Sequence, residues 1–158
     1  MKQNKWMQLV TCLVLITTIF SPMAIHASEE KVSYAVKPIM TSNQVDHRHS
    51  YFDLKVKPNM IQKLKTVIYN YENEDITVLL SVHNATTNIL SFDQEYVIIP
   101  AGEKRTVIAT LEMPDEEFDG IILGGMRFEK VNKEDTELNG VQIQNQYAYV
   151  IGVQLREN

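Results

Sequence analysis

The chain has 158 residues, with 15 basic and 20 acidic side chains and a formal net charge of −5. This negative charge disfavours nucleic acid and anionic lipid as partners. The only cysteine, Cys12, lies within the first 27 residues, so the remainder has no disulfide, no thiol nucleophile and no thiolate metal site.

Residues 1–27 have the organisation of a secretory signal peptide. Lys2 and Lys5 supply a positive start, an apolar run covers residues 7–20, and the segment ends in a small residue suited to cleavage. The apolar run is shorter than the ~20 residues that a membrane-spanning helix needs, so we expect a cleaved signal and not an anchor. The exported part, residues 28–158, has a usual length for one domain, and it has to fold by packing alone.

Alternating apolar and polar residues predict a series of short strands after the signal peptide. We expect Lys37 and Pro38 to terminate the first strand, and a turn at residues 100–103 to carry the chain from one sheet to another. Residues 64–69 and 76–83 are predicted to form either a hairpin or facing strands of two sheets. In chain order the expected strands are residues 32–36, 51–57, 64–69, 76–83, 96–99, 106–113, 121–128 and 147–155.

About eight short strands with no convincing amphipathic helix are typical of an all-β protein, and we expect an immunoglobulin-like β-sandwich. The clearest alternation lies in the second strand, where Phe52, Leu54 and Val56 are expected to face the core. An acidic segment, residues 114–120, is expected to close one helical turn with its carboxylates near the positive end.

The apolar segment that follows the acidic turn is expected to be a central strand, buried on both faces. Gly124 and Gly125 in its middle indicate either a bulge or tight packing, or else the close approach of a ligand or a partner strand. Asp119 and Gly120 are expected to set the bend into this strand. Arg127 is expected to pair with an acidic side chain of the preceding turn. We assign all five residues structural roles.

The sequence offers little for catalysis, since it contains neither a Gly-x-Ser-x-Gly motif nor a glycine loop for phosphate. The carboxylates of the acidic turn leave one remote enzymatic alternative, a glycosidase that uses a pair of carboxylates. Neighbouring carboxylates on one turn seldom face each other across a substrate, which disfavours this alternative. The residues concerned are Asp115, Glu116, Glu117 and Asp119.

His47 and His49 form a His-x-His pattern in a polar loop. In an extended segment both imidazoles lie on one face, as in a metal pair, whereas a solvated loop needs no metal. Zinc sites take three or four ligands, and no third ligand is evident nearby. We therefore expect no metal and no other cofactor.

Several short sequence motifs, taken together and in their order along the chain, are informative about the family. They are residues 43–44 (Asn-Gln), 50–54 (Ser-Tyr-Phe-Asp-Leu), 85–88 (Ala-Thr-Thr-Asn), 99–101 (Ile-Pro-Ala), 116–125 (EEFDGIILGG) and 146–152 (QYAYVIG). In this order the chain resembles the N-terminal, peptidoglycan-binding domain of the WxL-interacting proteins of Gram-positive bacteria. The resemblance covers nearly all of the part that follows the signal peptide.

The resemblance implies a non-enzymatic module of the cell surface or wall that binds peptidoglycan and works with WxL-domain proteins. The alternative is a protein-interaction module that binds a WxL partner without affinity for the wall. Members of the family have a longer segment where this chain has residues 90–96, and they continue into a second sandwich domain, a transmembrane helix and a basic tail. We therefore expect no stable membrane anchor in this chain, and the alternative of a truncated gene product stays open.

Peptidoglycan presents extended sugar and peptide faces, for which a shallow groove with aromatic and polar groups is sufficient. Binding modules of this architecture usually recognise ligands through loops at one end of the sandwich. The expected ligand-binding residues are Tyr51, Asn84, Thr86, Thr87 and Asn88.

Overall fold

The structure is a computed structural model, and it describes residues 32–84, 89–131 and 147–157. The predicted signal peptide lies outside these residues. The described part contains nine strands and no helix, which confirms the all-β class. The strands are β1 (Tyr34–Ile39), β2 (Phe52–Val56), β3 (Ile61–Asn70), β4 (Ile76–Asn84), β5 (Leu90–Phe92), β6 (Tyr96–Ile99), β7 (Lys104–Glu112), β8 (Ile121–Val131) and β9 (Ala148–Glu157).

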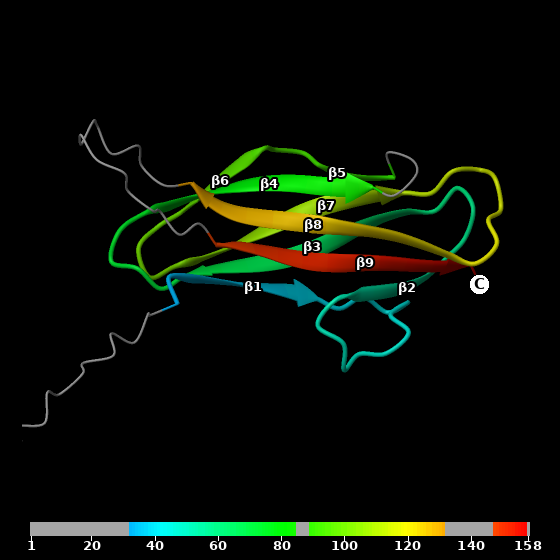
Figure 1. Cartoon of the computed structure of the whole chain (residues 1–158), viewed down its shortest axis with the longest axis horizontal. Coiled ribbons are helices and arrows are strands. Elements are labelled where there is room, and N and C mark those ends of the chain that lie inside the picture. The colour runs from blue at the N-terminus through cyan, green and yellow to red at the C-terminus, as the bar shows by residue number, and fades with distance from the viewer. Residues whose placement is uncertain (1–31, 85–88, 132–146, 158) are drawn as a thin grey trace, which may run out of the picture. The chain divides into compact units, whose positions relative to one another are not determined.

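The strands form two sheets that pack face to face. The first sheet has the order β1-β3-β7-β5, and the second has the order β2-β9-β8-β4-β6. In Figure 1 the strands β9, β8 and β4 lie in front of β3 and β7. Since β3 and β4 belong to different sheets, the facing-strand alternative is correct and the hairpin is wrong. The chain also crosses between sheets from β6 to β7, as predicted.

The core lies between the inner faces of the two sheets. Phe52, Leu54 and Val56 are fully buried, as their alternation predicts, and burial of each such side chain contributes about 1.5–3 kcal/mol. Tyr34 ties the edge of the first sheet to the second, because its hydroxyl lies 3.0 Å from the backbone oxygen of Phe128 and 2.9 Å from that of Tyr147, and these two acceptors share its one proton. Burial raises the pKa of the Tyr34 hydroxyl.

Strand β8 holds the central position of the second sheet, as predicted, with β4 on one side and β9 on the other. The prediction that it is buried on both faces is wrong. Met126 and Phe128 are fully buried, whereas Ile121 and Leu123 are 51% and 56% exposed. The first sheet covers only one face of β8, so its apolar run includes side chains that face solvent.

The two glycines of β8 do not form a bulge. Gly124 pairs with Asn84 and Val153, and Gly125 pairs with the neighbouring residues of the same two strands in unbroken register. A Cβ atom at Gly124 would lie 3.0 Å from the backbone oxygen of His83. The glycine at this position therefore fits the close approach of β4.

The acidic segment between β7 and β8 contains bends but no helical turn, so that prediction is wrong. The backbone N–H of Phe118 donates to the Glu157 carboxylate at 2.7 Å, and the backbone oxygen of Pro114 accepts from Asn59 at 2.8 Å. These partners lie on other segments and replace the hydrogen bonds of a helical turn. Gly120 has φ +95°, a left-handed conformation suited to the bend before β8.

Two further local predictions are wrong. Arg127 forms an ion pair with Glu129 on its own strand and not with the acidic turn, because residues two apart on a strand lie on the same face. Pro38 does not end the first strand, which continues to Ile39. Strand β1 is an edge of the first sheet, where a residue without an N–H is tolerated.

Candidate functional site

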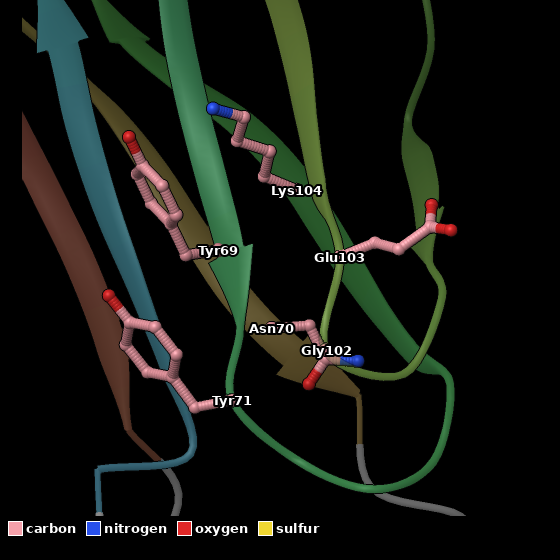
Figure 2. A pocket seen from close by; sticks show the side chains of 6 residues that line it. All are labelled: Tyr69, Asn70, Tyr71, Gly102, Glu103 and Lys104. Carbon is pink, nitrogen blue, oxygen red and sulfur yellow. The ribbon is translucent and has the colours of Figure 1, made fainter.

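A pocket open to solvent, with a volume of about 390 Å³, lies where β3 ends and β7 begins. We call it the tyrosine pocket, and Figure 2 shows its residues. Its size falls in the range of small-ligand sites, which occupy roughly 300–1,000 Å³. The lining residues are Tyr69, Asn70, Tyr71, Gly102, Glu103 and Lys104.

Two aromatic rings form the wall of the tyrosine pocket. The rings of Tyr69 and Tyr71 are nearly parallel, with centroids 6.3 Å apart and an interplanar angle of 20°. The Lys104 ammonium lies 5.8 Å from the centroid of the Tyr69 ring, within the range of a cation–π contact. In Figure 2 these three side chains project to the same side, whereas Glu103 points away from them. The wall therefore presents aromatic faces and one positive charge.

Asn70 holds the floor of the tyrosine pocket in place. It is only 1% exposed, and its side-chain nitrogen lies 2.8, 3.0 and 3.0 Å from the backbone oxygens of Glu74, Ile99 and Pro100, which share its two N–H groups. Its side-chain oxygen accepts a hydrogen bond from the backbone N–H of Glu72 at 2.9 Å. One buried amide thus joins the turn after β3 to the turn after β6.

The turn after β6 is fixed by its own contacts. Gly102 has φ +67°, and its N–H donates to the backbone oxygen of Glu72 at 3.1 Å. The Glu72 carboxylate in turn pairs with the Lys130 ammonium on β8. Tyr71 is anchored on the other side, because its N–H donates to the backbone oxygen of Ser33 at 3.0 Å. The pocket is therefore built on backbone that is already ordered before a ligand arrives.

The chemistry of the tyrosine pocket suits binding. It contains aromatic faces, one ammonium and one carboxylate, and it lacks a paired nucleophile and base. In residues 32–84, 89–131 and 147–157, no group of three histidine, cysteine or acidic side chains is placed to hold a metal ion. The same part of the chain has no helix long and apolar enough to cross a membrane.

Two of the five residues expected to bind ligand, Tyr51 and Asn84, are described by the structure, and they are not adjacent. Tyr51 precedes β2, at one edge of the second sheet, and Asn84 ends β4, with β9 and β8 between them. The side-chain nitrogen of Asn84 donates to the backbone oxygen of Leu90 at 3.2 Å, and its side-chain oxygen accepts from the backbone N–H of Leu90 at 3.1 Å. The remaining three, Thr86, Thr87 and Asn88, lie outside the described residues.

Asn84 is also far from the tyrosine pocket. Strand β4 starts beside the turn that follows Asn70 and runs nine residues from Ile76 to Asn84. At about 3.4 Å per residue, its two ends are roughly 27 Å apart. The pocket and Asn84 therefore lie at opposite ends of the sandwich.

Tyr51 lies in a charged environment near the loop that precedes β2. Its ring stacks on His49, with centroids 4.7 Å apart, and His49 lies 3.9 Å from both Asp46 and Asp53. Hydrogen bonds from Arg156 lower the pKa of the buried Asp53 carboxyl. The hydrogen bond from Arg48 likewise lowers the pKa of Asp46, to about 2. Both carboxylates are thus ionised at neutral pH and already paired with arginine.

The same geometry bears on the remaining sequence hypotheses. Among the described residues, His47 and His49 belong to no group of three side chains that could hold a metal ion. The carboxylates of the acidic turn are solvent-exposed: Asp115, Glu116, Glu117 and Asp119. They lie on one short segment between β7 and β8, outside the tyrosine pocket.

A family model described as the WxL Interacting Protein, peptidoglycan binding domain, matches residues 34–91 and 88–130. The chain belongs to this family. The match confirms the resemblance drawn from the sequence, and it spans every strand from β1 to β8. The family is described as a binding domain.

No curated protein matches the chain. Among solved structures, the PapD-like domain 7 of human CEP192 is similar with a TM-score of 0.54 at 8% identity, covering 80% of this chain and 85% of that one. A family 123 glycoside hydrolase from Clostridium perfringens is similar with a TM-score of 0.55 at 9% identity, covering 80% of this chain and 28% of that one. A Porphyromonas gingivalis protein of unknown function is similar with a TM-score of 0.52 at 14% identity, covering 80% of this chain and 48% of that one. At these identities the likenesses show a shared fold, and they confirm the immunoglobulin-like sandwich.

Sequence reasoning did not identify the tyrosine pocket. The available signal was the spacing of Tyr69 and Tyr71, because residues two apart at the end of a strand lie on one face. Lys104 gave no such signal, since its position beside Tyr69 depends on the register between β3 and β7. The family is described by the ligand that its members bind, but that description does not identify a site. The fold brings Tyr69, Tyr71 and Lys104 together.

Proposed function

We propose that this member of the family is a non-enzymatic module of the cell wall that binds peptidoglycan through the tyrosine pocket. The observation that carries the proposal is the pair of tyrosine rings beside Lys104, on backbone fixed by Asn70. The family description supports peptidoglycan as the ligand. Export by the N-terminal signal would place the chain in the compartment where that polymer lies.

The pocket chemistry matches the two kinds of group that peptidoglycan presents. Pyranose rings have apolar C–H faces, and the rings of Tyr69 and Tyr71 offer flat surfaces with a polar hydroxyl at the edge. The stem peptides carry carboxylates, for which the Lys104 ammonium is a suitable partner. An already ordered site loses little conformational entropy on binding, which favours affinity.

Replacement of both aromatic walls tests the proposal. We expect Tyr69→Ala/Tyr71→Ala to weaken binding by about tenfold or more, because aromatic anchors at the centre of a site often contribute 1–2 kcal/mol or more each. The measurement is sedimentation of the purified protein with peptidoglycan sacculi from which attached anionic polymers have been removed by hydrofluoric acid. The melting temperature is recorded in parallel, to express binding per folded molecule.

A double variant outside the pocket serves as the matched control. Tyr51→Ala/Tyr96→Ala also removes two tyrosine rings, one at the position expected from the sequence and one on β6. We expect this variant to sediment with sacculi as the unaltered protein does. Loss of binding in the control with retention in the pocket variant would overturn the pocket assignment and move the site to the region of Tyr51 or of Tyr96.

A second function, binding of a WxL-domain partner, is favoured by the open face of the second sheet. Six apolar side chains on this face are more than a third exposed, and exposed apolar patches mark interaction sites. Partner binding of this kind does not need affinity for the wall. The six residues are Tyr96, Ile98, Ile121, Leu123, Val131 and Val150.

Charge placed on that face tests the second function. We expect Leu123→Asp/Val150→Asp to abolish co-purification with a WxL-domain protein while binding to sacculi persists. Ile61→Asp is the control, since Ile61 is 69% exposed but lies on the first sheet. Co-purification that survives in the double variant would exclude this face as the contact.

A further inference from the structure

The outer face of the first sheet is basic, although the chain as a whole is acidic. Outward positions on β1, β3 and β7 carry four lysines, and Glu112 is the one acidic residue at the outward positions of these three strands. We call these four residues the lysine face: Lys37, Lys63, Lys65 and Lys104. The net charge of −5 therefore conceals a local excess of positive charge.

The lysine face spreads over β3 and its two neighbouring strands and reaches the tyrosine pocket. Lys63 and Lys65 are two residues apart on the same strand, which separates them by about 7 Å. Lys37 pairs with Val67 in the register between β1 and β3, so it lies diagonally beside Lys65 at a distance of roughly 7–8 Å. Lys104 pairs with Tyr69, four residues along β3 from Lys65, so it lies about 14 Å from Lys65, at the tyrosine pocket. Three positive charges are thus grouped at spacings of about 7–8 Å, and the fourth stands apart at the pocket.

These lysines are available to a partner. All four are exposed, and none lies within ion-pair distance of a carboxylate in the part of the chain that the structure describes. Lys63 donates a hydrogen bond to the Thr110 hydroxyl at 2.6 Å, which leaves its charge uncompensated. Ile39 and Ile108 flank Lys65 on the two neighbouring strands and are 43% and 38% exposed. The face therefore combines repeated cations with apolar surface.

We propose that the lysine face binds a linear polymer of polyol phosphate or sugar phosphate that carries one negative charge per repeat. Charge complementarity and the spread of the lysines over three neighbouring strands support an extended polyanion. Each lysine ammonium acts as a point charge that can donate to a phosphate oxygen in many orientations. The C–H groups of the polymer backbone would contact Ile39 and Ile108. This inference does not depend on the ligand of the tyrosine pocket.

The test uses soluble poly(glycerol phosphate) as the probe and titration calorimetry as the measurement. We expect the unaltered protein to bind it, with an affinity that falls steeply as salt is raised. Lys63→Gln/Lys65→Gln should weaken binding roughly tenfold at moderate salt and reduce the slope of log affinity against log salt by about 1.5–2. The control, Lys55→Gln/Lys57→Gln, removes the same charge at the same spacing from the β2 region and should bind as the unaltered protein does.

Several outcomes would overturn the inference. One is the absence of binding to the polymer, and another is an equal loss of affinity in Lys63→Gln/Lys65→Gln and in the control variant. The others are equal affinity for an oligothymidylate with the same number of phosphates, and binding to anionic lipid vesicles but not to the polymer. Binding to sacculi from which the anionic polymers have been removed distinguishes the lysine face from the tyrosine pocket. The Lys63→Gln/Lys65→Gln variant should still bind these sacculi, and Tyr69→Ala/Tyr71→Ala should still bind the soluble polymer.

Discussion

Asn70→Ala is expected to lower the free energy of unfolding by about 3 kcal/mol, because a buried group that loses its partner costs about 1–3 kcal/mol and this change removes several. The substitution leaves the backbone oxygens of Ile99 and Pro100 and the N–H of Glu72 without the amide that now satisfies them. In a domain of this size the melting temperature should fall by roughly 10 °C. Chemical denaturation and thermal melting both measure the effect.

The same substitution should also weaken binding to sacculi per folded molecule, since Asn70 orders the turns that carry the tyrosine pocket. Asn73→Ala is the control, because Asn73 lies exposed in the same turn. We expect that variant to keep both its melting temperature and its affinity. An unchanged melting temperature in Asn70→Ala would show that water replaces the amide and that the turns are stable without it.

The parts of the fold that could be predicted from the sequence are those fixed by local alternation. Phe52, Leu54 and Val56 repeat every second residue, and this period is sufficient to assign both a strand and its buried face. Strand β5 has only three residues and no alternation of its own, so it was not predicted. It exists because β7 provides an edge with which it pairs.

The candidate site could not be predicted in the same way, because it depends on contacts between distant segments. Tyr69 and Tyr71 share a face by local spacing, but Lys104 reaches them only through the register of β3 with β7. Asn70 lies between two tyrosines before a polar turn, where a solvated residue is the ordinary expectation, and yet it is buried. The lysine face likewise combines residues from three strands that are separate in the sequence.

Gly124→Val is expected to cost about 3 kcal/mol of stability, the upper part of the range for overpacking. Its Cβ atom would lie 3.0 Å from the backbone oxygen of His83, and a backbone atom held by the pairing of β4 with β8 moves aside less readily than a side chain does. Gly125→Val is the matched control on the neighbouring residue. There the Cβ atom would meet a Val150 methyl at 3.5 Å, an ordinary contact, and we expect a change within about 1 kcal/mol.

The comparison of the two glycines also decides between structural and ligand-binding roles for β8. We propose that Gly124 is required for the approach of β4, so binding to sacculi per folded molecule should be unchanged in Gly124→Val. Melting temperatures and sedimentation with sacculi measured on both variants test this. Equal melting temperatures in the two variants, together with lost binding in Gly124→Val, would contradict the structural role. That result would place a ligand against the second sheet, at the opposite end of the sandwich from the tyrosine pocket.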